Sequence, residues 1–442
     1  MHVRRLAVAA TAAATLVLVG NTLAGAHHPD GGEWEGNTSL QGGVELRAKS
    51  DVKCVRGMAD EYPCKGIDLV SFLPHKRMGG GVGSDIWGWT DPRTGREYAL
   101  VGQSDGTSFV DVTNGKRPRW LGKLPTATEP IIWHDIKVYK SHAFIVSEAD
   151  GHGLQVFDLT RLRGVREPRT WSVDARYRGF GNAHNIAINK QSGYAYVVGA
   201  TSRPNTVCGT TGGPIVLDIL TPKRPELAAC INDDGYTHDT QCVIYRGPDA
   251  DYRRREMCFS SNEDTLTIHD VSDKSNIELV SRTSYLGATY THQGWLTPNQ
   301  RYFLLGDEVD ELAGEQTRTA TYVWDMRNLD NPRNTGVYNA KTKAIDHNLY
   351  IKGRFTYQSN YRAGLRILDN RSIKDAFLFE VGYFDIFPKD DATKFNGTWS
   401  NYPYFKSGKV IVNGIEQGLY VLRPQERTLR RTADRMAERR IG

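Results

Sequence analysis

The fold of this chain is decided by Phe109-Val110-Asp111-Val112-Thr113, an apolar strand that ends in an aspartate. Five further copies follow, at Val156-Phe157-Asp158-Leu159-Thr160, Val216-Leu217-Asp218-Ile219-Leu220, Ile268-His269-Asp270-Val271-Ser272, Val323-Trp324-Asp325-Met326-Arg327 and Ile367-Leu368-Asp369-Asn370-Arg371. Successive aspartates lie 47, 60, 52, 55 and 44 residues apart, and a seventh copy, Tyr420-Val421-Leu422-Arg423, lacks the carboxylate. A period of about 50 residues is the length of one four-stranded propeller blade. We therefore predict an all-β, seven-bladed β-propeller.

Each repeat has the pattern of four short strands, and the aspartate ends the third. The repeat after Asp111 predicts strands at 136–139, 143–146 and 154–157, with a weaker fourth strand at 169–173. Apolar and polar residues alternate in these segments, and Gly, Asn and Asp separate them, as is typical of strands and turns. An aspartate at a strand end can accept backbone N–H groups of the next turn. We therefore expect the repeated aspartate to be structural.

The last repeat is one strand short, since residues 399–402, 410–413 and 419–422 supply only three. A matching strand, Ile67-Asp68-Leu69-Val70-Ser71-Phe72-Leu73, precedes the first repeat. An open ring would leave two unpaired sheet edges, which closure removes. We expect this N-terminal strand to complete the last blade.

The two ends of the chain do not follow the repeat. Arg4 and Arg5, an apolar run over residues 6–19 and Ala24-Gly25-Ala26 indicate a signal peptide at residues 1–26. The run is too short to span a membrane, which takes about 20 residues. We expect a secreted, extracellular protein with no transmembrane anchor, in which residues 27–66 form a strap over the ring and precede a propeller at 67–424. A basic tail at 425–442 ends the chain, and we expect it to be solvated and frayed, with a short basic helix as the alternative.

The six cysteines suit an oxidising compartment. Fifteen pairings are possible, and local geometry favours one. Cys54 and Cys64 close a short loop, and Cys208 and Cys230 flank one repeat's middle strand. Cys242 and Cys258 lie on two consecutive predicted strands. Zinc binding by these cysteines is not expected, because the chain has no C-x-x-C pair.

A second periodicity runs through the histidines. Five of the twelve open a repeat, with spacings of 50, 54, 54 and 55 residues: His134, His184, His238, His292 and His347. Polar residues follow the second strands, at Asp105, Glu148, Glu263, Asp307, Glu308 and Glu416. In antiparallel order, the start of strand one and the end of strand two lie on the same side of the disc. Histidines and carboxylates should therefore converge on one face near the propeller axis.

Three interpretations of this face remain open. The histidines could bond backbone carbonyls or polar groups of neighbouring blades and so hold the blades in register. They could instead bind a divalent metal ion together with carboxylates, with ligands among His238, Glu263, His292, Asp307 and Glu308. One His–Glu pair could also perform acid–base catalysis. The chain has no H-E-x-x-H or G-x-S-x-G motif that would favour catalysis.

Aromatic residues gather near the same segments, at Trp87, Trp89, Trp133, Tyr290, Trp295, Trp399 and Tyr402. Core packing explains most of them, and some can line a pocket for a sugar or a peptide. The net charge of +5 collects in the tail, and the chain shows no clustered basic face or reader motif for nucleic acid.

The chain resembles the secreted bacterial choice-of-anchor B proteins, whose propellers are built from LVIVD repeats. The resemblance covers residues 54–424 and rests on Ser84-Asp85-Ile86-Trp87-Gly88-Trp89, Tyr236-Thr237-His238-Asp239-Thr240-Gln241-Cys242-Val243-Ile244-Tyr245, Thr291-His292-Gln293-Gly294-Trp295-Leu296, Ile345-Asp346-His347-Asn348-Leu349-Tyr350 and Asn360-Tyr361-Arg362-Ala363-Gly364-Leu365-Arg366-Ile367-Leu368-Asp369. It implies a propeller fold and export, but no catalytic residue. Many members carry a C-terminal sorting tail, whereas this chain has neither an apolar anchor nor a sorting motif after Pro424.

These observations predict an extracellular or cell-envelope binding module that uses the histidine and carboxylate face. Its partner would be an extracellular protein, a peptide or a glycan, and we expect a monomer. The alternative is a metal-assisted hydrolase or lyase on the same face, which would need a divalent metal ion. The most asymmetric groups there are His238 with Glu263, and His292 with Asp307 and Glu308.

Overall fold

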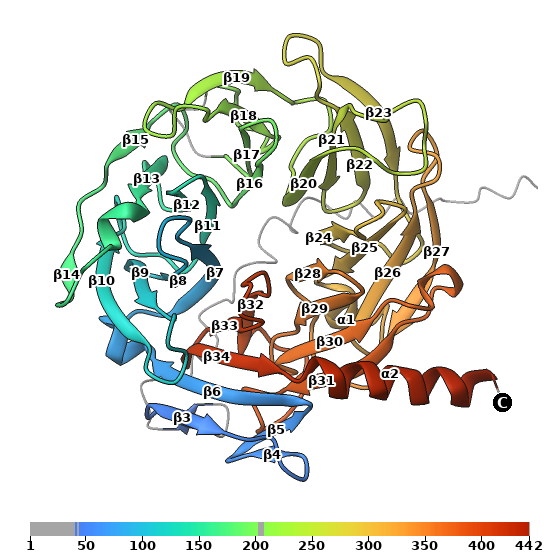
Figure 1. Cartoon of the computed structure of the whole chain (residues 1–442). Helices are drawn as coiled ribbons and strands as arrows, with labels where there is room; N and C mark the ends of the chain where they lie inside the picture. Colours follow the sequence, from blue (N-terminus) through green and yellow to red (C-terminus); the bar gives the residue numbers. More distant parts are fainter. Residues whose placement is uncertain (1–39, 42–43, 202–206, 442) are drawn as a thin grey trace, which may run out of the picture. The chain divides into compact units, whose positions relative to one another are not determined.

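Seven four-stranded antiparallel sheets follow one another along the chain in the computed structural model, and each corresponds to one sequence repeat (Figure 1). Blade one consists of β7(Gly83–Thr90), β8(Glu97–Gln103), β9(Gly106–Asp111) and β10(Arg119–Pro125). Blade two consists of β11(His134–Tyr139), β12(His142–Ser147), β13(Leu154–Asp158) and β15(Ala175–Tyr177), and blade three of β16(Asn185–Asn189), β17(Tyr194–Val198), β18(Ile215–Asp218) and β19(Glu226–Cys230). Blade four consists of β20(Asp239–Ile244), β21(Glu256–Ser261), β22(Leu266–Asp270) and β23(Glu278–Thr283).

The remaining blades have the same order of strands. Blades five to seven are β24(Thr291–Leu296), β25(Tyr302–Asp307), β26(Ala320–Asp325) and β27(Arg333–Asn339); β28(Leu349–Lys352), β29(Phe355–Ser359), β30(Leu365–Asp369) and β31(Phe379–Phe384); and β32(Thr398–Tyr402), β33(Val410–Gly414), β34(Gly418–Pro424) and β6(Ile67–Pro74). The predicted seven-bladed β-propeller is confirmed. The structure describes residues 40–41, 44–201 and 207–441, so the predicted signal peptide at 1–26 lies outside the described residues.

The repeated aspartate ends the third strand of six blades and forms the same contact in each. Its Oδ1 accepts the backbone N–H of the residue two positions on, at 2.8–3.0 Å in every copy, and the six acceptors are Asp111, Asp158, Asp218, Asp270, Asp325 and Asp369. These bonds satisfy donors that the strand ladder leaves unpaired. The structural role expected for the repeat is confirmed.

The ring closes where the repeat fails. Strand β6 pairs with β34 in antiparallel register, and Asp68 lies opposite Arg423, the residue that replaces the seventh aspartate. Figure 1 shows the blue strand β6 beside the red strand β34. The N-terminal strand therefore completes blade seven, as the sequence predicts.

Additional strands cover the outer edges of several blades. Strand β3(Lys49–Val52) pairs with β6, and β5(Tyr62–Lys65) joins β31 to β4(Met58–Ala59). The described part of the predicted strap therefore extends two sheets at their edges instead of crossing the ring. The short pair β1(Leu40–Gln41) and β2(Val44–Glu45) precedes them.

Residues 169–173 were predicted to form the fourth strand of blade two, and this prediction was wrong. Strand β14(Arg169–Thr170) pairs in parallel with β10 of blade one, and β15 is the fourth strand of blade two. An unpaired edge strand exposes a row of backbone donors and acceptors, which explains why nearby segments are recruited to cover it.

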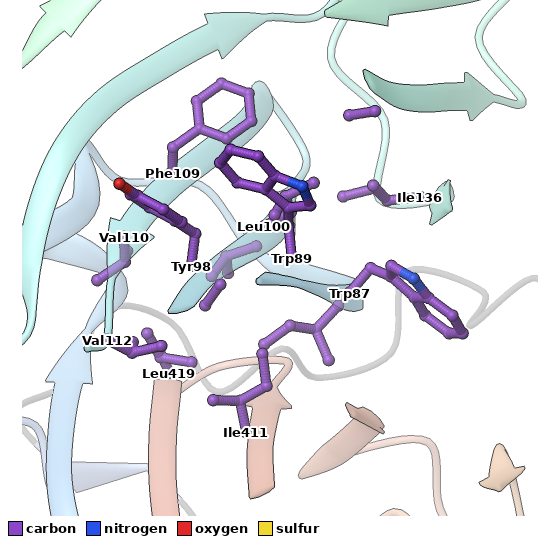
Figure 2. Close-up of a cluster of buried hydrophobic side chains, with 14 of the residues drawn as sticks. Trp87, Trp89, Tyr98, Leu100, Phe109, Val110, Val112, Ile136, Ile411 and Leu419 are labelled. Atoms are coloured by element: carbon purple, nitrogen blue, oxygen red, sulfur yellow. The ribbon is translucent and has the colours of Figure 1, made fainter. Parts of the chain in front are cut away.

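The core lies between the faces of neighbouring blades. The rings of Phe109 and Phe157, from blades one and two, stack at 4.5 Å between centroids, and Trp89 stacks on Tyr98 at 5.1 Å. Figure 2 shows the rings of Phe109, Trp89 and Tyr98 with Leu100 and Val110, and shows the indole of Trp87 directed away from them. Trp87 and Trp89 thus have different roles, although they are two residues apart in β7.

The basic tail folds, contrary to the frayed end that the sequence favoured. Helix α2(Glu426–Ile441) lies along β31 (Figure 1), and its Leu429 and Ala433 are fully buried. The Arg371 guanidinium lies 2.8 Å from the Asp434 carboxylate and ties the helix to blade six. Burial of one apolar stripe explains why a helix with so many arginines is held in place.

The other helical segments in the described residues are single turns: α1(Asp310–Ala313), η2(His75–Met78), η3(Leu159–Leu162) and η4(Ile373–Asp375). The three predicted disulfides, Cys54–Cys64, Cys208–Cys230 and Cys242–Cys258, are all present. Within the described residues, no helix is both long and apolar enough to cross a membrane.

Candidate functional site

The repeated histidines come together at one end of the axial channel. Ring centroids of consecutive members lie 4.2 Å apart for His184 and His238, 4.1 Å for His238 and His292, and 4.6 Å for His292 and His347. His134 lies at the edge of this group and faces His152 at 5.7 Å. The predicted convergence of the blade-opening histidines near the axis is therefore present, and we name His184, His238, His292 and His347 the histidine tier.

Hydrogen bonds between blades orient two rings of the tier. The Nδ1 of His238 lies 2.9 Å from the carbonyl oxygen of His292, and the Nδ1 of His347 bonds the carbonyl oxygen of Trp399. A nitrogen that faces a carbonyl must carry the proton, so both rings direct Nε2 elsewhere. The register-holding interpretation and the metal-binding interpretation are thus compatible, because each uses a different nitrogen.

Glu308 is the carboxylate that lies against the tier. Its Oε2 is 3.5 Å from Nε2 of His292, and its Oε1 is 3.5 Å from Nε2 of His347. The Tyr361 hydroxyl donates a hydrogen bond to Oε1 at 2.5 Å. Burial raises the pKa of Glu308 to about 8, against the opposing effect of the Tyr361 hydrogen bond. Burial likewise lowers the pKa of His347 to about 3, so this imidazole is neutral at pH 7.

Three of these groups have the geometry of a metal site. Ligand atoms of His238, His292 and Glu308 all lie within 4.8 Å of one another, and all three side chains are buried. Two neutral imidazoles and one carboxylate are a common donor set for zinc and related divalent ions. Tyr361 bonds the carboxylate from behind, and the carbonyl of His292 bonds Nδ1 of His238, as outer partners of metal ligands do.

The other predicted residues lie near the tier but have separate partners. Glu148 bonds Nδ1 of His184. Asp307 accepts the backbone N–H groups of Thr289 and Tyr290 and so holds its own loop. Glu416 bonds Asn396 and Gly397, and Asp105 pairs with Lys123 at 2.6 Å, each within its own blade. The backbone of Glu263 forms a β-bridge with Thr291 and so joins blade four to blade five.

The space at the histidine tier is narrow. Its cavity has a volume of about 10 Å³ and is lined by the tier, His134, Trp133, Trp399 and their neighbours. That is the space of a single water molecule or ion. The five histidine side chains are buried, at 0–6% exposure, so they contribute little surface to the predicted binding face.

A buried charged layer separates this tier from the rest of the channel. Lys137, with its side chain 13% exposed, lies 3.2 Å from Asp85 and also bonds Asp135. Asp135 accepts the N–H of Ile186 from the next blade at 2.7 Å. Burial raises the pKa of Asp239 to about 7 beside this layer. The charges link blades one, two and three across the axis.

A larger cavity lies toward the other end of the inner strands. Its volume is about 380 Å³, within the range of small-molecule sites. One wall is aromatic and comes from blades one, five, six and seven, with Trp87, Trp295, Tyr350, Tyr402 and Tyr404. Blades two, three and four supply a mainly polar wall and rim, including Asn189, Lys190, Gln191, Gln241 and Arg246. We name this space the aromatic cavity.

The aromatic wall is rigid because its rings pack edge to face. Trp87 contacts Tyr402 at 5.1 Å, and Trp295 contacts Tyr350 at 5.1 Å between centroids. Lys137 of the charged layer lies 4.7 Å from the Trp87 centroid and forms the floor. Trp295 and Tyr404 are only half-buried, so their rings are accessible to a ligand.

Several of these residues were missed by sequence reasoning. Trp87, Trp295 and Tyr402 were singled out as aromatics, but Tyr350, Tyr404 and Lys137 were not. Tyr350 follows His347 by three residues and Lys137 follows His134 by three, so both lie on inner strands that the histidine repeat already identified. Tyr361 gave no signal of its own, because it lies in a turn between strands β29 and β30.

Comparisons with known proteins add little beyond the fold. No family model and no curated protein matches the chain. Among solved structures, the Cps50 (Swd1) β-propeller domain of Myceliophteria thermophila is 11% identical, with a TM-score of 0.48, 78% of this chain covered and 98% of that chain. The computationally designed Ika8 protein is 10% identical, with a TM-score of 0.47 and coverage of 77% and 82%.

Proposed function

We propose that this protein is a secreted propeller of the choice-of-anchor B type that binds a sugar unit of an extracellular glycan. The aromatic cavity carries this proposal. A sugar ring has an apolar face that packs on Trp and Tyr, and a rim of hydroxyls that bonds amides and charged groups. The cavity offers both on opposite walls, in a volume of about 380 Å³.

The charges at the cavity further define the ligand. Lys190 and Arg246 are exposed at the polar wall, and Asp239 is the one acidic residue in the described lining. A positive rim favours anionic ligands through the local potential. We therefore expect sugars with a carboxylate, such as uronic acids, to bind more tightly than neutral sugars of the same size.

The test is a titration of the full chain with neutral and acidic mono- and disaccharides, followed by intrinsic tryptophan fluorescence. We expect saturable binding that Trp295→Leu weakens about tenfold, since a lost aromatic contact costs about 0.5–1.5 kcal/mol beyond its buried area. Trp133→Leu, at the histidine tier, is the matched control and should leave affinity unchanged. Absence of binding to every sugar, or equal losses in both variants, would refute the proposal.

Metal-assisted hydrolysis or lyase chemistry at the histidine tier is a second candidate, which the convergence of His238, His292 and Glu308 favours. Catalytic zinc sites have three protein ligands and one open position. The cavity of about 10 Å³ admits an ion or a water but no substrate, so binding ranks first. Elemental analysis of protein purified without chelators tests the metal. Less than a tenth of an equivalent of any transition metal would remove this candidate.

A further inference from the structure

Three carboxylates meet beside α1, in a place that neither the sugar proposal nor the histidine tier uses. Asp310 and Glu311 begin α1, after β25, and Asp346 immediately precedes His347 before β28. One oxygen of each lies within 4.8 Å of the others. Asp310, Glu311 and Asp346 are 0%, 8% and 1% exposed. Three buried negative charges at this spacing repel one another strongly unless something neutralises them.

The described residues around this acidic cluster satisfy only part of it. Tyr322 donates its hydroxyl to Oδ2 of Asp310 at 2.8 Å, and the N–H of Ala320 bonds Oε1 of Glu311 at 2.9 Å. Among the described residues, no group outside the cluster donates to the four remaining oxygens: Oδ1 of Asp310, Oε2 of Glu311 and both oxygens of Asp346. Within the cluster, the carboxyl of Asp310 contacts the side chain and the backbone N–H of Glu311, and Asp346 contacts its own backbone.

Cationic side chains do not complete the site either. In the part of the chain that the structure describes, no Lys or Arg forms an ion pair with Asp310, Glu311 or Asp346. Other buried carboxylates of this protein do have such partners, for example Asp85 with Lys137. A buried polar atom without a partner is rare in native proteins, and four in one place indicate an absent ligand.

Strand β25 is shaped to admit the Asp346 carboxylate. A Cβ at Gly306 would lie 2.0 Å from Oδ2 of Asp346, so only glycine allows this approach. The contact holds Asp346 against blade five, although the residue belongs to the entry of blade six. The cluster is therefore a junction between two blades.

We propose that Asp310, Glu311 and Asp346 bind one calcium ion and thereby join blade five to blade six. Calcium takes six to eight oxygen ligands at about 2.3–2.6 Å, so two of its ligands lie at most about 5 Å apart. One oxygen of each of the three carboxylates lies within 4.8 Å of the other two, which satisfies this limit. The set contains oxygen only, whereas zinc favours imidazole and thiolate. Magnesium prefers a smaller octahedral shell with several waters. The site is independent of the aromatic cavity.

Calorimetric titration of chelator-treated full-length protein with calcium chloride tests the proposal. We expect one calcium per chain and at least about tenfold weaker binding in Asp346→Asn, which keeps the size of the side chain and removes one ligand charge. Asp375→Asn makes the same change at an exposed carboxylate outside the cluster, and this control should bind calcium as the parent does. No calcium binding, or equal binding in the parent and Asp346→Asn, would overturn the proposal.

Thermal unfolding provides a second test, because calcium should reverse which protein, the parent or Asp346→Asn, unfolds at the higher temperature. Without calcium, Asp346→Asn should unfold at a higher temperature than the parent, because it removes one of three crowded buried charges. With calcium in excess, the order should reverse, because only the parent gains from the bound ion. If the variant is more stable under both conditions, the carboxyls are merely protonated and the calcium site does not exist.

Terbium luminescence locates the ion. Tyr322 is bonded to Asp310 and lies 4.6 Å from the ring of Tyr285, so both tyrosines are close enough to sensitise a lanthanide bound at the cluster. Tyrosine-excited terbium emission should appear in the parent, fall on addition of calcium and be lost in Asp346→Asn. Emission that survives in Asp346→Asn would place the ion elsewhere.

Discussion

The two ends of the axial channel are built from the same inner strands, yet they differ in symmetry and access. At the histidine tier, four blades contribute equivalent imidazoles, packed 4.1–4.6 Å apart around a cavity of about 10 Å³. At the aromatic cavity, the blades contribute different residues around about 380 Å³. The repeated end has room for an ion only, whereas the unrepeated end has room for a small molecule.

This contrast shows where specificity arises in a repeat protein. A residue that recurs from blade to blade is placed by the repeat and serves to join blades, as His238 does through the carbonyl of His292. An organic ligand needs unequal walls, and those come from positions such as Trp295 and Gln241 that the repeat does not fix.

The largest expected effect concerns the charged layer between the two ends. Lys137→Ala leaves Asp85 and Asp135 buried without their shared cation, and should lower the free energy of unfolding by about 3–5 kcal/mol. Urea unfolding measures the change. Lys116→Ala, which removes an exposed pair with Asp51, is the control and should have no measurable effect. If Lys137→Ala left the free energy of unfolding unchanged, the two channel ends would not be separated by a charged layer.

The next prediction concerns the zinc affinity of the histidine tier. Tyr361→Phe removes the hydroxyl that bonds Glu308, and should weaken zinc affinity about 10- to 100-fold without loss of folding. Competition with a chromogenic chelator gives the affinity. Tyr357→Phe, in the same blade, should bind zinc as the parent does. Equal affinities for the parent and Tyr361→Phe would show that Glu308 is not a ligand.

Acid should destabilise the histidine end. Burial, with a smaller contribution from His152, lowers the pKa of His134 to about 3, whereas an unfolded histidine titrates near 6.5. The unfolded chain therefore takes up a proton that the folded chain excludes, and stability present above pH 6.5 is lost as the pH falls toward 3. The cost approaches about 1.4 kcal/mol for each pH unit.

His134→Gln removes that proton uptake, so its free energy of unfolding should fall less steeply than that of the parent between pH 7 and pH 5. Urea unfolding at both pH values gives the two slopes. Parallel slopes would mean that His134 is protonated in the folded protein.

The smallest effect concerns the rim of the aromatic cavity. Arg246 is exposed, so Arg246→Gln should weaken binding of an acidic sugar only about twofold to fivefold and leave a neutral sugar unaffected. The difference should shrink at high ionic strength, because salt screens exposed charges. The same loss for neutral and acidic sugars would indicate that Arg246 acts by packing alone.

Sequence reasoning succeeded where the pattern is repeated. The aspartates gave the number of blades, Arg423 marked the closure, and the histidines identified the channel end at which they meet. It failed where tertiary packing determines the local structure, as in the tail. Leu429 is buried because α2 packs on β31, and the sequence alone does not reveal that contact. The acidic cluster was missed for the same reason, since Asp346 is 35 residues from Glu311 and only the neighbouring blade brings them together.

Hydrogen–deuterium exchange with and without the tightest-binding sugar shows which channel end the ligand covers. We expect slower exchange in residues 187–191 and 239–246, which line the aromatic cavity, and no change in residues 288–293 at the histidine tier. Protection of residues 288–293 with no change at 187–191 would contradict this expectation.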